Sequence, residues 1–216
     1  MRIAFDIDGV LADFAGAYRF IAHRLRSRGP ATGILALSEA GLSAGPVSSR
    51  LERRIWREIQ STENFWATLD PLEPDVIAGI HERAGRHRWE TFFVTQRPAT
   101  RGDTVQRQTQ RWLVGQGFPL PAVIAHRSSR GKLAAALDLD FLVDDTVEHC
   151  VDVLEVSSAR PILVCRKENP VIETNAKRLG IATCRSVTEA LDIVVQGPAR
   201  RKKRASLLGG RAVPAP

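Results

Sequence analysis

The chain has 216 residues, of which 44% are hydrophobic and 25% charged, proportions that are ordinary for a soluble globular protein. This length allows one large domain, or a core domain with a smaller insertion, and it suffices to bury a sizeable core. The composition excludes collagen-like, disulfide-dense and wholly disordered chains. The three cysteines are far apart and form neither a zinc-binding nor a disulfide pattern.

The net charge of +7 is concentrated at the C-terminal end of the chain. Residues 197–216 contain six basic residues and no acidic one, whereas residues 1–196 contain 25 basic and 24 acidic side chains. The body of the chain therefore lacks the basic excess of a nucleic-acid-binding domain, and any weak binding of nucleic acid is expected from the tail. The composition of this tail predicts disorder.

Short apolar runs alternate with amphipathic segments along most of the chain. The runs predict strands at residues 3–7, 91–94, 122–125, 141–143, 162–165 and 181–184. The segments between and after them predict helices at residues 104–114, 131–137, 147–156, 171–179 and 187–195. Near-continuous apolar strands that alternate with helices are typical of a parallel sheet covered on both faces. We therefore predict an α/β fold with a Rossmann-like, doubly wound parallel sheet.

A gap of about eighty residues without a predicted strand separates the first strand from the second. Helical patterns occupy residues 14–26 and 47–59, and the composition of residues 30–46 favours a loop, with one short helix as an alternative. We interpret the gap as a small helical cap, residues 14–74, inserted into a core of residues 1–13 and 75–196.

The N-terminal segment and the hydropathy pattern bear on location. The first ten residues carry two aspartates within an apolar run, which is unlike a signal peptide. No apolar stretch approaches the roughly 20 residues of a membrane-spanning helix. We expect a cytoplasmic protein without a membrane partner, and the oligomeric state stays open.

Acidic and hydroxyl side chains follow three of the predicted strands. Asp6 and Asp8 end the first strand, Thr95 ends the second, and Asp144 and Asp145 end the strand at 141–143. In a parallel sheet, ligands bind beyond the carboxyl ends of the strands. Several carboxylates at one place need a cation, because they cannot all stay ionised at close range, and hard oxygen ligands suit Mg²⁺. The sequence therefore predicts a magnesium site at this edge.

The same residues resemble a known signature. Asp-Ile-Asp-Gly-Val at residues 6–10, Val-Thr at 94–95, Lys132 and Leu-Val-Asp-Asp at 142–145 resemble the four motifs of the haloacid dehalogenase (HAD) superfamily of phosphotransferases. The resemblance covers residues 1 to about 190. It is closer still to the 5′(3′)-deoxyribonucleotidases of that superfamily at residues 6–14, 64–66, 69–71, 94–98 and 144–148.

This resemblance implies a Mg²⁺-dependent phosphomonoesterase with two catalytic aspartates. Asp6 would be the nucleophile that forms an aspartyl-phosphate, and Asp8 the general acid and base. Asp6, the main-chain carbonyl of Asp8, and Asp144 would hold the metal, with Asp145 orienting its shell. Thr95 would donate its hydroxyl to a phosphoryl oxygen.

The motifs point less clearly to the cation that would bind the phosphate and to the side chain that would bind the rest of the substrate. Lys132 is our first choice for the cation. In the deoxyribonucleotidases the lysine can come from the helix after the second motif, where this chain has Arg107 and Arg111 instead. Phe14 matches a position that contacts the nucleobase, whereas Trp56 and the pair at 65–66 are interpreted as structural. The family also has an aromatic pair midway through its cap, and residues 31–47 contain no aromatic residue.

We expect hydrolysis of a small phosphorylated substrate, with a nucleoside monophosphate as first choice. A sugar phosphate is an alternative, and so is a non-catalytic phosphate-binding protein on the same fold. A phospho-accepting receiver domain would have its acidic pair on the first strand and its acceptor on a middle strand, which fits this chain less well. The histidines show no ligand spacing, although His149 favours a supporting polar contact.

Overall fold

The computed structural model describes residues 1–26 and 48–197. These residues form a parallel sheet of six strands in the order β3-β2-β1-β4-β5-β6. The strands are β1 (Arg2–Asp6), β2 (Glu90–Thr95), β3 (Ala122–Ala125), β4 (Phe141–Asp144), β5 (Arg160–Val164) and β6 (Ala182–Cys184). The predicted strands and the α/β, Rossmann-like class are confirmed.

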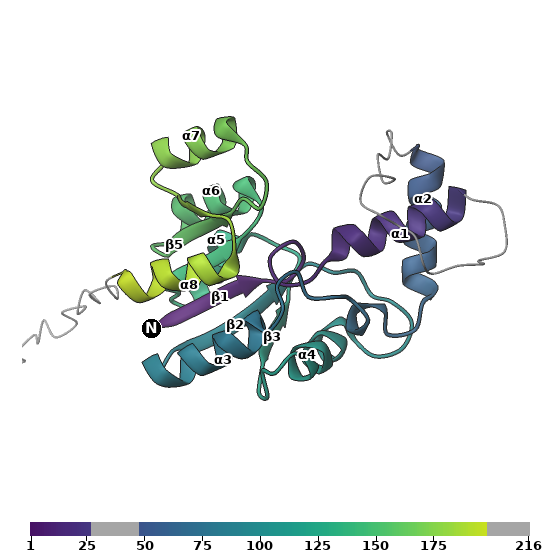
Figure 1. Cartoon of the computed structure of the whole chain (residues 1–216), viewed down its shortest axis with the longest axis horizontal. Helices are drawn as coiled ribbons and strands as arrows, with labels where there is room; N and C mark the ends of the chain where they lie inside the picture. Colours follow the sequence, from purple (N-terminus) through teal and green to yellow (C-terminus); the bar gives the residue numbers. More distant parts are fainter. Residues whose placement is uncertain (27–47, 198–216) are drawn as a thin grey trace, which may run out of the picture.

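Helices cover both faces of this sheet (Figure 1). They are α3 (Val76–His87), α4 (Val105–Gly115), α5 (Arg130–Ala136), α6 (Val147–Val156), α7 (Pro170–Arg178) and α8 (Val187–Gln196). Successive side chains of β1 alternate between the faces. Ile3 and Phe5 belong to a core shared with α3, α4 and α8, whereas Ala4 belongs to one shared with α5 and α6. The prediction lacked only α3 among these helices.

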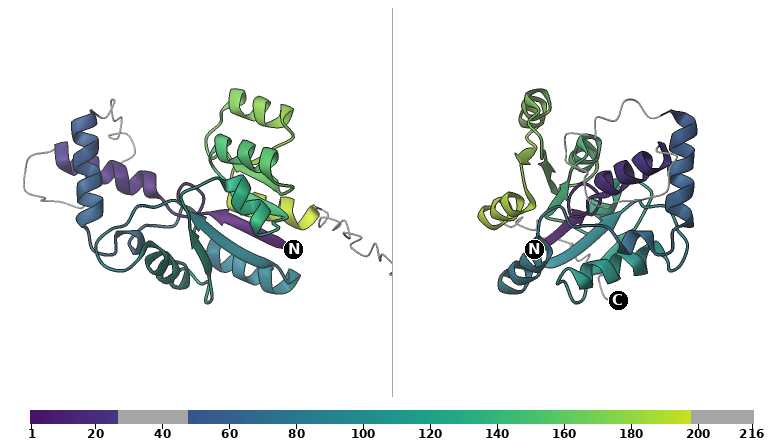
Figure 2. Two further views of the ribbon diagram at one scale, coloured as in Figure 1. Left: turned by 180° about the vertical axis from the view of Figure 1, so that it is seen from behind. Right: turned by 45° about the vertical axis from the view of Figure 1, so that its right-hand side comes forward.

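The segment between β1 and α3 protrudes from the core as a cap (Figure 2). Its described parts are α1 (Phe14–Arg26), α2 (Ser49–Ser61) and the short 3-10 helix η2 (Phe65–Ala67). α1 and α2 pack against each other, as their buried apolar residues at helical spacing require. The loop expected at residues 30–46 and the basic tail beyond Gly197 lie outside the described residues.

The two segments that join the cap to the core run side by side. The amide of Asp13 donates to the carbonyl of Asp70 at 2.9 Å, and the amide of Leu72 donates to the carbonyl of Leu11 at 2.8 Å. The chain therefore leaves the core and returns to it at one place, just beyond the carboxyl end of β1.

The cysteines form no disulfide, as their wide spacing in the sequence predicts. Cys150, Cys165 and Cys184 are free thiols, and burial raises the pKa of Cys184 to about 12. None of the helices in the described ranges has the length and apolarity that a bilayer crossing requires.

Candidate active site

Three neighbouring strands bring acidic and hydroxyl side chains to one edge of the sheet. Asp6 ends β1 and lies in register with Val94 of β2, the residue before Thr95, while Asp144 ends β4 on the other side of β1. Asp6, Thr95 and Asp144 are 6%, 1% and 0% exposed. The structure thus brings together the three predicted residues that come from different strands.

Asp6 and Thr95 line a cavity of about 220 Å³, and Asp144 is buried behind it. Its polar lining includes Asp6, Asp8, Thr95, Gln96, Arg97, Arg130, Asp145, Thr146 and His149. Its aromatic lining comes from the cap and from the segment that returns to the core, and comprises Phe14, Trp56 and Trp66. The cavity is therefore charged on the side of the sheet and aromatic on the side of the cap.

Arg130 is the buried cation of this edge, with a side chain only 2% exposed. Its guanidinium donates to Asp6, and its Nε lies 3.5 Å from Oδ2 of Asp144. Nε and Nη1 of Arg130 have no hydrogen-bond partner among the described residues, and neither does the buried hydroxyl of Thr95. Buried donors are normally satisfied, so these groups suit an oxyanion that enters the cavity.

The carboxyls at this edge repel one another. Burial, and after it the charge of Asp144, raises the pKa of Asp6 well above its usual value, although Arg130 opposes the shift. Burial and Asp144 also raise the pKa of Asp145. A bound cation would offset both the cost of burying the ionised carboxylates and their mutual repulsion.

The oxygen donors fit a small hard cation, which takes one or two carboxylates and keeps several waters. The side chains of Asp6, Asp144 and Asp145 and the carbonyl of Asp8 are the donors available. Within residues 1–26 and 48–197, no three His, Cys, Asp or Glu side chains are grouped as metal ligands. A metal here would accordingly be held by two carboxylates, a carbonyl and water, beside Arg130.

The cation at the aspartates is Arg130, whereas our first choice from the sequence was Lys132. α5 begins at Arg130, and its N-cap Ser129 accepts from the amide of Lys132 at 2.9 Å. Two residues along an α-helix correspond to a rotation of about 200°, so Lys132 leaves α5 on another side, where it is exposed. The two alternatives, Arg107 and Arg111, pair with an aspartate before their own helix and do not line the cavity.

Hydrogen bonds join the N-terminus of α5 to α6. The carboxylate of Asp152 accepts from the hydroxyl of Ser129 and from the amide of Gly131, both at 2.8 Å. These hydrogen bonds, above all the one from Gly131, lower the pKa of Asp152. A Cβ at Gly131 would lie only 2.2 Å from the carbonyl oxygen of Asp152. The close approach of the two helices therefore fixes the position of Arg130.

A second buried arginine holds Asp8. Nε and Nη2 of Arg97 donate to the two carboxylate oxygens of Asp8 at 2.8 and 2.7 Å. Nη1 donates to the hydroxyl of Thr109 at 3.0 Å, and the guanidinium lies 4.8 Å from the centre of the Trp66 ring. Arg97 lies within the motif at residues 94–98, but the sequence alone predicts no catalytic or binding role for it.

Asp144 has its own hydrogen-bond partners. Nδ1 of His149 lies 3.1 Å from both carboxylate oxygens of Asp144, and the amide of Thr146 donates to Oδ1 at 2.9 Å. The polar contact expected from His149 is therefore present. It orients a carboxylate that is completely buried at the end of β4.

The aromatic side of the cavity contains more residues than expected. Phe14 stacks on Trp56 with a centroid distance of 5.7 Å and an interplanar angle of 29°, and its ring centre is 5.6 Å from that of Trp66. Phe14 lines the cavity. Trp56 and Trp66 line it too, although the sequence predicts structural roles for both, whereas Phe65 does not line it.

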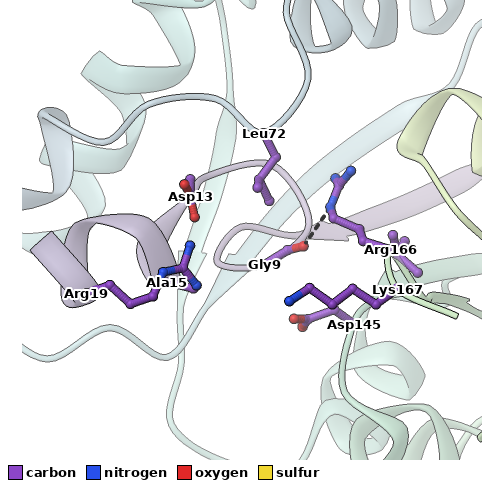
Figure 3. A pocket seen from close by; sticks show the side chains of 9 residues that line it. Gly9, Asp13, Ala15, Arg19, Leu72, Asp145, Arg166 and Lys167 are labelled. Atoms are coloured by element: carbon purple, nitrogen blue, oxygen red, sulfur yellow. Dashed lines mark hydrogen bonds between the residues drawn. The ribbon is translucent and has the colours of Figure 1, made fainter. Parts of the chain in front are cut away.

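A larger cavity of about 740 Å³ adjoins the site and shares Asp145 with it. Arg19 on α1 and Lys167 beyond β5 approach it from two sides (Figure 3). Arg166 at its wall donates to the carbonyl of Val10 at 2.6 Å and thereby holds the loop that follows β1.

The wall between the two cavities requires glycine at position 9. Gly9 has a φ of +86°, and a Cβ there would lie 2.0 Å from Oδ2 of Asp145. Only glycine tolerates both the left-handed conformation and this approach. The loop that carries Asp8 can therefore pass directly over Asp145.

No protein-family model matches the chain, and no curated protein sequence matches it significantly. A HAD family hydrolase from Deinococcus radiodurans R1, solved with bound phosphate and sodium, is similar with a TM-score of 0.53 at 14% identity, over 90% of this chain and 94% of that one. A Thermotoga maritima protein described as a putative beta-phosphoglucomutase has a TM-score of 0.53 at 16% identity, over 91% of this chain and 99% of that one. At these identities the likeness shows that the fold is HAD-like.

Proposed function

We propose that this chain hydrolyses phosphoric monoesters through an aspartyl-phosphate formed on Asp6. One observation carries the proposal: Asp6 lines a cavity in which the hydroxyl of Thr95 and the Nε and Nη1 of Arg130 have no hydrogen-bond partner among the described residues. A phosphoryl group offers the oxygens that such donors need, and a carboxylate is a known nucleophile toward phosphorus.

The reaction has two half-reactions, the formation of the aspartyl-phosphate and its hydrolysis. In the first, the carboxylate of Asp6 attacks phosphorus, the bond to the leaving oxygen breaks, and Asp8 gives that oxygen a proton. In the second, water attacks phosphorus, the bond to Asp6 breaks, and Asp8 accepts the proton of the water. Thr95 and Arg130 hold the phosphoryl oxygens throughout. Arg130 replaces Lys132 in this role because it lines the cavity beside Asp6 and has donors without a partner among the described residues, whereas Lys132 does not line the cavity.

Magnesium is part of the proposal. Asp6, Asp144 and the carbonyl of Asp8 would hold it, and Asp145 would orient its shell. When bound, the ion supplies positive charge that neutralises phosphoryl oxygens and favours the ionised form of Asp6 against its raised pKa. The phosphate and sodium bound to the Deinococcus hydrolase support the choice of an anion and a cation for this fold.

For the substrate we propose a nucleoside monophosphate in the cytoplasm. The support comes from Phe14 and Trp56, whose rings line the same cavity as Thr95 and Arg130 and offer a surface for a planar base. Stacking of a base on an aromatic side chain contributes about 1–3 kcal/mol. A sugar phosphate is the alternative, because Asp6 and Asp8 would act on it in the same way.

The test is phosphate release from nucleoside monophosphates, sugar phosphates and p-nitrophenyl phosphate, with Mg²⁺ or with EDTA. We expect release by the wild type with Mg²⁺ and none by Asp6→Asn, whose amide cannot attack phosphorus. If the wild type releases phosphate from no substrate, the proposed function is wrong. If Asp6→Asn keeps most of the activity, the nucleophile is wrong.

A further inference from the structure

Arg97 forms a paired contact with Asp8 that the reaction above does not yet use. Its Nε and Nη2 donate to both oxygens of the carboxylate at 2.8 and 2.7 Å. Two parallel hydrogen bonds between a guanidinium and a carboxylate fix the direction of the carboxylate as well as its position. The side chain of Asp8 nevertheless remains 24% exposed, so it is held without being enclosed.

The guanidinium of Arg97 is itself immobilised by the core. Its side chain is 0% exposed, and its Nη1 donates to Thr109 of α4, which is fully buried. Its face lies over Trp66, whose Nε1 donates to the carbonyl of Pro98 at 2.9 Å. Thr109 of α4 and Trp66 of η2 therefore fix Arg97, and through it the direction of Asp8.

We propose that Arg97 is the positioning residue of the second half-reaction, in which water attacks the phosphoryl group on Asp6. A carboxylate has about four acceptor positions, and Arg97 occupies two of those on Asp8. The remaining positions are left for the water that Asp8 must deprotonate. This inference rests on the proposed function and assigns a part of the same site.

The two half-reactions depend differently on Asp8, and this difference makes the role measurable. Nitrophenolate leaves readily as an anion, so the first half-reaction with p-nitrophenyl phosphate needs no proton from Asp8. The second half-reaction needs Asp8 whatever the substrate, because the attacking water must lose its proton. A wrongly directed Asp8 therefore slows the second half-reaction alone, and the phosphorylated protein accumulates.

The experiment compares wild type, Arg97→Lys and Thr109→Val by rapid mixing with p-nitrophenyl phosphate and Mg²⁺. Lysine cannot form the paired contact, and valine removes one anchor of Arg97 while filling nearly the same space. Thr91→Val is the matched control, since the buried hydroxyl of Thr91 has no partner among the described residues. Melting temperatures show which variants are folded.

We expect Arg97→Lys to release up to one nitrophenolate per protein in a burst and then to turn over about 10- to 100-fold more slowly than wild type, because a misdirected Asp8 loses only part of an acid–base contribution of about 100- to 10,000-fold. Mass spectrometry after acid quenching should find the phosphorylated protein. Thr109→Val should show a smaller burst, and wild type and Thr91→Val none.

Slower turnover without a burst in both folded variants would overturn the inference, because a merely structural defect slows both half-reactions. If Arg97→Lys does not fold, Thr109→Val decides the question by the same criterion. A wild type that releases no nitrophenolate would contradict the proposed function, and this inference with it.

Discussion

The contact between α5 and α6 predicts the effect of one added methyl group. In Gly131→Ala, the Cβ would lie 2.2 Å from the carbonyl oxygen of Asp152 and 2.7 Å from the Cβ of Val156, so α5 has to move. Alanine gains up to about 1 kcal/mol in helix propensity. Overpacking costs about 1–3 kcal/mol, and the two hydrogen bonds to Asp152 are worth about 0.5–1.5 kcal/mol each. The opposing terms leave a net destabilisation of about 3 kcal/mol.

The assay is chemical denaturation followed by tryptophan fluorescence, together with phosphate release. Gly85→Ala is the control, because Gly85 lies in α3 and a Cβ there has no neighbour within 4 Å. It should stabilise the protein by about 0.5–1 kcal/mol. Gly131→Ala should also lower turnover, since Arg130 moves with α5. Unchanged stability would refute the close approach, and full activity in a destabilised variant would refute the link to Arg130.

Four other perturbations test the site and the tail. Asp6→Asn should abolish turnover and, in EDTA, should change the melting temperature more favourably at pH 7 than at pH 4. Because the pKa of Asp6 is raised in the folded state, its ionisation costs stability progressively as the pH rises from about 4. A melting-temperature difference between Asp6→Asn and wild type that is the same at pH 4 and at pH 7 would contradict this reasoning. EDTA should stop wild-type turnover and Asp144→Ala should raise the Mg²⁺ requirement, whereas full activity in EDTA would exclude the metal role. Removal of residues 197–216 should change the hydrolysis of small substrates by less than about twofold while weakening salt-sensitive binding to polyanions; a large loss of turnover would show that the tail packs on the core. Phe14→Ala should lower kcat/KM for a nucleoside monophosphate up to about 100-fold more than for p-nitrophenyl phosphate, and equal losses would make Phe14 a packing residue.

The sheet could be predicted because its strands are buried on both faces and therefore carry almost unbroken apolar runs. Residues 141–143 show this in β4, where all four residues are buried. α3 was missed because its conventional start residue does not act as a cap and its helix pattern contains two glycines. Its N-cap Asp75 has a φ of 58° and makes no capping hydrogen bond with its side chain, and Gly79 and Gly85 lower the helix propensity.

The acidic edge could be predicted for a similar reason, since the ends of the strands follow from local pattern and the parallel sheet brings those ends together. Arg130 could not, because the choice between it and Lys132 depends on the residue at which α5 begins. Arg97 and Trp56 reach the cavity through tertiary packing. Arg97 bonds a carboxylate 89 positions earlier in the chain, a separation that no local pattern reports.

The paired segments at the base of the cap have a consequence for how the chain tolerates changes in length. Because the amide of Asp13 bonds the carbonyl of Asp70, the distance between the start and the end of the cap is set by that pair and not by what lies between. A change in the length of the cap then alters a closure entropy, which grows slowly with the number of residues between the paired segments. The register of the strands around Asp6 is untouched by such changes, so relatives with caps of very different length could keep the same catalytic edge.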